Sequence, residues 1–146
     1  MRKTIAHRRI SDGTDQSVLS HLTEVGELAS RFATKANLSD QGKLLGLLHD
    51  FGKYSEEFQR YIESGVGKLN PDDEGWVDSK NLKGKVDHST AGAQYIWNWC
   101  KQRSQKTGHG ELAGQILALC IASHHSGLIN CISVEGDQDF CKRIQK

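Results

Sequence analysis

The chain has 146 residues, which suits one domain with a single hydrophobic core and is too short for two. Apolar residues make up 36% and charged residues 25%, a composition typical of a soluble globular protein. The formal net charge of +1 gives no basic field, so a nucleic-acid partner has to be argued from a site. No apolar run approaches the roughly 20 residues that span a bilayer, and the N-terminus lacks a secretory signal. We therefore expect a cytoplasmic protein without a membrane partner.

Three helices are predicted in the first half of the chain. Apolar residues recur at steps of three and four over 17–36, which predicts an amphipathic helix. Ser39 is typical of an N-cap, and the leucine-rich run after it predicts a buried second helix that ends near Gly52. Ser55 is a further N-cap candidate, and Gly65 is expected to close the third helix.

The second half of the chain is predicted to be a long loop followed by two helices. Residues 65–86 are rich in glycine and acidic residues and predict a loop, whose lysines are offset by these acids. Asp87 is expected to cap the next helix, which Gly108–Gly110 breaks. Glu111 then opens a last helix that stops at Gly127. Because no segment alternates with a period of two, the predicted fold class is all-α.

The four cysteines are predicted to be free thiols. None of them forms a C-x-x-C pair, and their spacing does not fit a zinc ribbon or finger. Two of them lie on apolar predicted helices, where a thiol behaves as a small hydrophobic group. The four are Cys100, Cys120, Cys131 and Cys141.

Five of the seven histidines lie at or near predicted helix ends. His49 and Asp50 end the buried second helix, in the run LLHDFGK at 47–53. A carboxylate among leucines is costly to bury unless it is paired or bound to a metal. Several helix ends can therefore converge on one pocket. The other histidines that contribute to this prediction are His21, His88, His124 and His125.

This set of side chains predicts a two-metal hydrolytic site. Imidazole nitrogens suit divalent transition metals such as Fe, Mn, Co, Ni and Zn, with Mg²⁺ as an alternative. The two oxygens of Asp50 can bridge two such ions. Two metals about 3.5–4 Å apart activate water and stabilise the leaving oxygen in phosphodiester cleavage. Lys53, about one turn from Asp50, is a candidate for contacting the scissile phosphate.

Simpler interpretations of the individual residues stay open. His21 or His88 taken alone is more typical of a hydrogen-bonded core or helix-start residue, and His124-His125 of a helix C-terminus favoured by the dipole. Lys53 can equally be a solvated lysine after a helix stop. His7 and His109 lie in polar contexts rich in arginine or glycine, and we assign them no function.

Taken in order, the motifs resemble a known family. The simple H…HD pattern of His21 and His49-Asp50 belongs to the broad HD-domain phosphohydrolases. DHSTAGA at 87–93 and ASHHSGL at 122–128 resemble something narrower, the HD nuclease domain of the type I CRISPR-associated helicase–nuclease. The resemblance covers about residues 17–128 and implies an HD-domain helical bundle.

The resemblance also implies a mechanism and partners. Members of that family hold two transition-metal ions and degrade single-stranded DNA. The DNA is fed by a helicase domain, and an RNA-guided CRISPR surveillance complex recruits the enzyme. Carried over by position, the first metal would be bound by His21, His49 and Asp50. The second would be bound by Asp50, His88, His124 and His125, while Lys53 matches the lysine after the HD pair and Ser126 lies in the matching turn.

One departure separates the sequence from the family pattern, which ends with a further downstream aspartate in the first metal site. Asp137 and Asp139 come too early to match it. We therefore expect residues 1–146 to be a partial HD domain, truncated at its C-terminus and continuing into more HD domain and a helicase. The alternative functions are an HD phosphohydrolase acting on nucleotides or cyclic dinucleotides and a metal-free helical interaction module.

Overall fold

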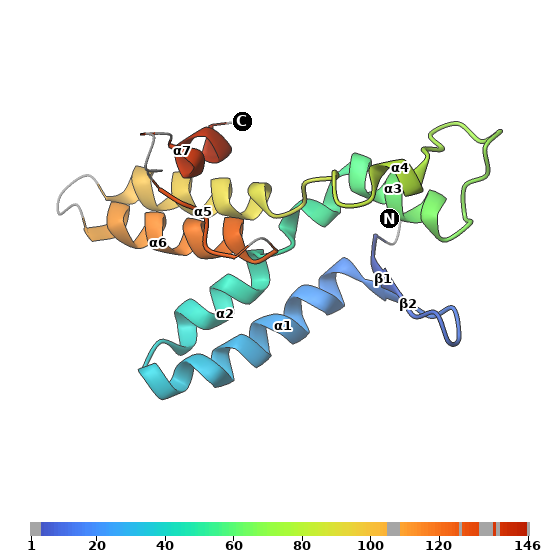
Figure 1. Cartoon of the computed structure of the whole chain (residues 1–146). Coiled ribbons are helices and arrows are strands. Elements are labelled where there is room, and N and C mark those ends of the chain that lie inside the picture. Colours follow the sequence, from blue (N-terminus) through green and yellow to red (C-terminus); the bar gives the residue numbers. More distant parts are fainter. Residues whose placement is uncertain (1–3, 105–108, 126, 132–135, 137, 146) are drawn as a thin grey trace.

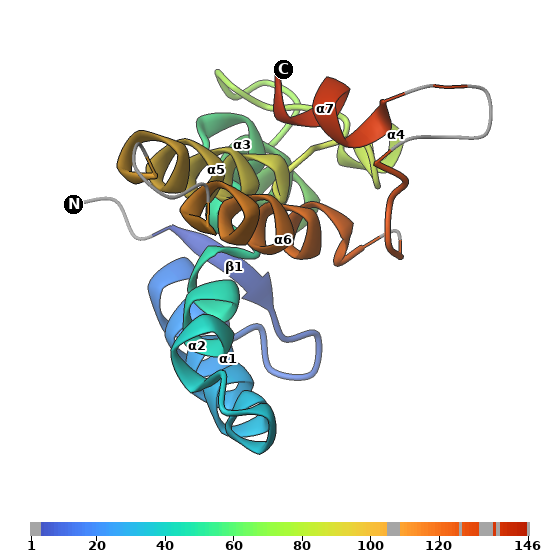
Figure 2. The same cartoon turned by 90° about the vertical axis from the view of Figure 1, so that its left-hand side faces the viewer.

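Two helical hairpins dominate the computed structural model, which describes residues 4–104, 109–125, 127–131, 136 and 138–145 (Figure 1). One hairpin consists of α1 (Val18–Ala33) and α2 (Ser39–Leu48), and the other of α5 (Thr90–Arg103) and α6 (His109–Ser123). Figure 2 shows α5 and α6 lying across the end of the first hairpin. The predicted all-α class is confirmed. No helix in the described ranges is long and apolar enough to cross a membrane.

The first hairpin largely follows the sequence prediction. Ser17 caps α1 by accepting a hydrogen bond from the Ser20 N–H at 3.1 Å, and the last predicted turn is the 3₁₀ helix η1 (Thr34–Ala36). Asn37 then adopts a left-handed conformation with φ of 58°. The N-cap of α2 is Leu38, so the prediction of Ser39 in that role is wrong by one residue. The Leu38 carbonyl accepts the first helical bond, from Gly42, because the left-handed turn has already reversed the chain.

The second predicted helix ends earlier than expected. α2 stops at Leu48, not near Gly52, and the chain continues as the 3₁₀ helix η2 (Phe51–Tyr54). Asp50, at φ of −112° and ψ of 25°, lies between the two helices. The Gly52 N–H leaves the helical hydrogen-bond ladder and donates to the His88 carbonyl at 3.0 Å. The break therefore joins the end of α2 to the segment that precedes α5.

The chain between η2 and α5 contains one predicted helix and one unexpected helix. Ser55 caps α3 (Glu56–Gly65) by accepting from the Phe58 N–H at 3.2 Å, so both predicted ends of this helix are confirmed. The expected 65–86 loop contains the short helix α4 (Ser79–Leu82). Asp78 caps it through hydrogen bonds from two backbone N–H groups.

The second hairpin packs against the end of α2 through a glycine. A Cβ added at Gly92 would lie 1.9 Å from the Leu48 carbonyl oxygen, so only glycine permits this approach. Asp87 caps the start of α5 as predicted, with Oδ1 3.1 Å from the N–H groups of Ser89 and Thr90. The core beside these contacts contains Leu48, Ala93, Ile96, Cys100, Ala118, Ile121, Ala122 and Phe140.

The boundaries of α6 differ from the prediction. The helix begins at His109, two residues before the expected Glu111, and ends at Ser123, before His124 and the expected stop at Gly127. Gly127 has φ of 73°, which is a glycine conformation, but it lies beyond the helix. Of the predicted break at 108–110, residue 108 lies outside the described residues.

Three short elements were not predicted. The strands β1 (Ile5–Arg8) and β2 (Asp15–Ser17) pair antiparallel, and they are too short to show a periodic pattern. The helix α7 (Asp139–Ile144) packs on the second hairpin through Phe140, which is 5% exposed. The predicted free thiols are confirmed, with Cys100 buried in the core.

Candidate metal centre

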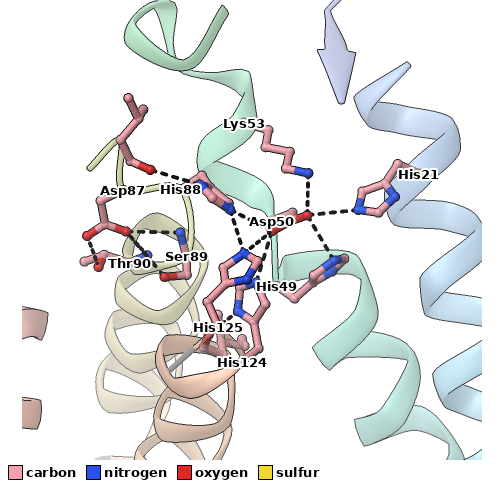
Figure 3. A network of polar contacts seen from close by, with 12 residues as sticks. His21, His49, Asp50, Lys53, Asp87, His88, Ser89, Thr90, His124 and His125 are labelled. Atoms are coloured by element: carbon pink, nitrogen blue, oxygen red, sulfur yellow. Dashed lines mark hydrogen bonds and ion pairs between the residues drawn. The ribbon is translucent and has the colours of Figure 1, made fainter. Parts of the chain in front are cut away.

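Asp50 lies at the centre of the candidate site, where α1, α2, η2, the residues before α5 and the end of α6 meet (Figure 3). It is 3% exposed. Charged groups are rarely buried to this degree without partners. Asp50 has six such partners, divided between its two carboxylate oxygens.

The first oxygen, Oδ2, faces three nitrogens. The Nε2 atom of His21, from the first turns of α1, lies 2.9 Å away, and the Nε2 atom of His49 lies 3.2 Å away. The Lys53 ammonium, from η2, donates to the same oxygen at 2.8 Å. The Lys53 side chain is only 4% exposed, so the interpretation as a solvated lysine is wrong.

The second oxygen, Oδ1, faces three further imidazoles. Its distances to the Nε2 atoms are 3.1 Å for His124, 3.6 Å for His88 and 3.8 Å for His125. His88 and His125 also place their Nε2 atoms 2.7 Å from each other. Because both nitrogens point at the same small region as Oδ1, a shared cation there would satisfy all of them.

Backbone carbonyls orient three of these imidazoles. The Nδ1 atom of His49 donates to the Gly46 carbonyl at 2.8 Å, that of His88 to Val86 at 3.0 Å, and that of His124 to Ile121 at 2.7 Å. A carbonyl oxygen only accepts, so each Nδ1 carries the proton and each neutral ring leaves Nε2 with a free lone pair. This second-shell arrangement is typical of metal-binding histidines. The residues present therefore fit a metal site.

Charge and burial act on these groups in opposite directions. Burial alone would raise the pKa of Asp50, but hydrogen bonds from His124, His49 and Lys53 outweigh it and hold that pKa far below its ordinary value. For His21, burial outweighs the attraction of Asp50 and lowers the pKa. The hydrogen bond to Asp50 outweighs burial at His124 and raises its pKa. Asp50 is thus an anion throughout the physiological range and available to a cation.

The start of α5 is tied to the end of the chain. Arg143 of α7 donates to Ser89 Oγ at 2.6 Å and to Thr90 Oγ1 at 3.0 Å. The same Thr90 hydroxyl donates to Asp87, which caps the helix. Because His88 lies inside this network, α7 contributes to holding the His88 backbone in place.

One residue of the cluster was missed from the sequence. His7 on β1, assigned no function, places Nε2 2.9 Å from the Lys53 ammonium, and its ring packs edge-on against His21 at 4.6 Å. Burial and the Lys53 charge lower its pKa to about 4. His109, which was also assigned no function, begins α6 as an exposed residue. Only the short β-hairpin, which has no clear sequence pattern, brings His7 to the site.

A buried amide fixes β1 against Lys53. The Gln59 side chain, 4% exposed, accepts from the Ile5 N–H at 2.8 Å and donates to the Ile5 carbonyl at 3.0 Å. It also donates to the Lys53 carbonyl at 2.7 Å. One side chain thus sets the distance between the strand that carries His7 and the 3₁₀ helix that carries Lys53.

The predicted residues fall into two groups that can each hold a metal ion. Ligand atoms of Asp50, His88, His124 and His125 lie within 4.8 Å of one another, as do those of His7, His21 and Asp50. Every predicted site residue thus lies in one cluster, with Asp50 common to both groups. Ser126 and Asp137 lie outside the described residues, and Asp139 lines a cavity together with His125.

The comparison with known families decides the assignment. The family model described as Cas3, HD domain, matches residues 8–141. The chain belongs to this family. The Cas3 HD family consists of HD-type, metal-dependent nuclease domains of CRISPR defence, and its HD domains bind divalent metals. No curated protein matches the chain.

Proposed function

We propose that the chain cleaves phosphodiester bonds of single-stranded DNA, with Asp50 bridging two divalent metal ions. One observation supports this most directly: each oxygen of the buried Asp50 faces its own set of imidazole Nε2 atoms. A single structural histidine–aspartate pair would need one such contact. Two opposed sets are what a bridging carboxylate requires.

The residues divide into two ligand sets under this proposal. His21, His49 and Oδ2 of Asp50 would hold the first ion. His88, His124, His125 and Oδ1 would hold the second. The imidazole-rich donor set favours Fe, Mn, Co, Ni or Zn over Mg²⁺, which prefers oxygen ligands.

The ions, when bound, supply activation of water and stabilisation of the leaving oxygen. The protein's own residues orient and hold. The Nδ1 bonds of His49, His88 and His124 fix their rings before any ligand arrives, so binding costs little reorganisation. Lys53 already lies 2.8 Å from Asp50, and its ammonium would contact the charge that develops on the scissile phosphate.

The substrate and partners follow from the family. CRISPR defence implies foreign DNA in the cytoplasm, marked by an RNA-guided surveillance complex. A helicase domain, on the same or a partner chain, would supply the single strand. An unpaired strand suits the site because Asp50 is 3% exposed, and a duplex would have to separate locally before its phosphates reached such a buried centre.

Circular single-stranded DNA tests this function, because it has no ends. The tag-free chain, reconstituted with Mn²⁺, Co²⁺ or Ni²⁺, should linearise and then degrade the circle, and a chelator should stop the reaction. Double-stranded circles should resist. An enzyme that hydrolyses mononucleotides or cyclic dinucleotides but leaves the DNA circle intact would replace this proposal with a nucleotide phosphohydrolase.

A further inference from the structure

A cavity of about 530 Å³ opens beside the metal cluster. On the cluster side it is lined by His7 and Lys53 and by His88 and His125, so it adjoins both proposed metal positions. Its volume is within the range of small-molecule sites, about 300–1,000 Å³. The opposite walls come from α3 and α4 and contain Phe58, Tyr61, Ile62, Val66, Ser79, Lys80 and Lys83.

The α3 wall of the cavity is aromatic. Phe58 is 5% exposed, and its ring contacts the His88 ring at 5.2 Å and lies 5.5 Å from the Lys53 ammonium. Tyr61, one turn later, is partly exposed, with its ring 5.9 Å from that of Phe58. Within the described part of the chain the Tyr61 hydroxyl makes no hydrogen bond. Phe58 thus supports the metal cluster, while Tyr61 presents an aromatic ring to the cavity.

The α4 wall adds positive charge. Lys80 and Lys83 are exposed, and neither forms an ion pair with a described residue. Asp78 is engaged in capping α4 through Lys80 and Asn81. An apolar aromatic wall with two lysines beside it favours a flat aromatic group attached to an anionic backbone.

We propose that this cavity holds the base of the nucleotide next to the scissile phosphate of single-stranded DNA. The base would lie against Tyr61, and the flanking phosphates would contact Lys80 and Lys83. The inference rests on the proposed nuclease function, since it names a substrate subsite. It also assigns a role to the 65–86 segment, whose lysines the sequence had left without one.

Binding without metal tests this inference separately from catalysis. A short single-stranded oligothymidylate and an oligonucleotide of the same length made only of abasic residues carry the same phosphates. With a chelator present, the full chain should bind the base-bearing strand about 5- to 100-fold more tightly than the abasic strand. Tyr61→Ala should reduce this ratio to about one, whereas Tyr61→Phe, which keeps the ring, should retain it.

Two further measurements guard the interpretation. Tyr95→Ala removes a tyrosine that is 52% exposed on α5 and does not line the cavity, so it should leave the ratio unchanged. Circular dichroism should show that Tyr61→Ala remains folded. Lys80→Ala with Lys83→Ala should weaken binding of both strands alike, since the phosphates are common to both.

The outcomes separate the two proposals. Equal binding of the two strands by the unaltered chain, or an unchanged ratio in folded Tyr61→Ala, would overturn the base subsite even if DNA is cleaved. Thymidine monophosphate displacing the strand at comparable concentration would instead indicate a mononucleotide site and also overturn it. A Tyr61-dependent ratio without cleavage of circular DNA would support the subsite and count against the nuclease function.

Discussion

The Nε2 atom of His7 lies 2.9 Å from the Nζ atom of Lys53, although 46 residues separate them in the sequence. Lys53 also donates to Asp50 at 2.8 Å. A divalent cation on Asp50 would compete with the ammonium for this oxygen and repel it. His7 then remains as the neutral acceptor that keeps Lys53 beside the cluster.

Replacing His7 should therefore impair cleavage through Lys53. His7→Ala is expected to lower the rate of single-strand cleavage about 10- to 100-fold, as misplacement of a catalytic group does. Metal bound by the group of Asp50, His88, His124 and His125 should be unchanged in elemental analysis. His109→Ala, which removes an exposed histidine from α6, is the matched control. An unchanged rate in His7→Ala would remove His7 from the account.

Lys53 itself should act on the substrate and not on the metal. Lys53→Ala is expected to lower cleavage about 100-fold, comparable to the loss of one preorganised donor to a developing charge. Its metal content should equal that of the unaltered chain, because an ammonium is no metal ligand. Lys43→Ala, on the exposed part of α2, should be silent. Loss of metal in Lys53→Ala would mean that the role of Lys53 has been misassigned.

The Gln59 amide should be important for stability. Gln59→Leu keeps a similar volume but leaves the Ile5 N–H, the Ile5 carbonyl and the Lys53 carbonyl without this partner. Unsatisfied buried groups of this kind cost about 1–3 kcal/mol each, so unfolding by urea should occur at clearly lower concentration. Gln41→Leu, at an exposed site, should change the midpoint little. Equal midpoints for the two variants would argue against the buried hydrogen bonds.

Gly92 should be equally sensitive, for steric reasons. The added Cβ of Gly92→Ala would lie 1.9 Å from the Leu48 carbonyl, so α5 must move away from the end of α2. We expect a loss of about 1–3 kcal/mol or more in the free energy of unfolding. Gly65→Ala provides the control, since its Cβ would meet Ser79 at an ordinary 3.4 Å. Similar thermal midpoints in both variants would contradict the close approach.

The sequence predicted the long helices and most of the cluster. Helical periodicity located the two hairpins, and histidines at helix ends pointed to Asp50 as their common partner. Local patterns set the ends less well: Asp50 leaves the helix because Gly52 bonds to His88, a contact across 36 residues of sequence that no local pattern contains.

His7 was missed for the same kind of reason. It lies on a strand of four residues, which is too short for a periodic signal, and a buried glutamine 52 residues further along the chain brings it to the site. The aromatic cavity was also hidden, because it combines α3 with a four-residue helix inside an expected loop. The contacts that only tertiary structure creates were thus the ones that the sequence did not predict.

The bridging role of Asp50 is tested most directly by metal content. The tag-free chain and its Asp50→Ala variant would be reconstituted with Mn²⁺, Co²⁺ or Ni²⁺ and analysed for bound metal. Asp40→Ala, at the exposed start of α2, would serve as the control. Because both ligand sets share Asp50, the variant should retain less than about a tenth of the metal bound by the unaltered chain, and Asp40→Ala should retain all of it. Full metal content in Asp50→Ala, or an unaltered chain that binds none, would contradict the two-metal centre.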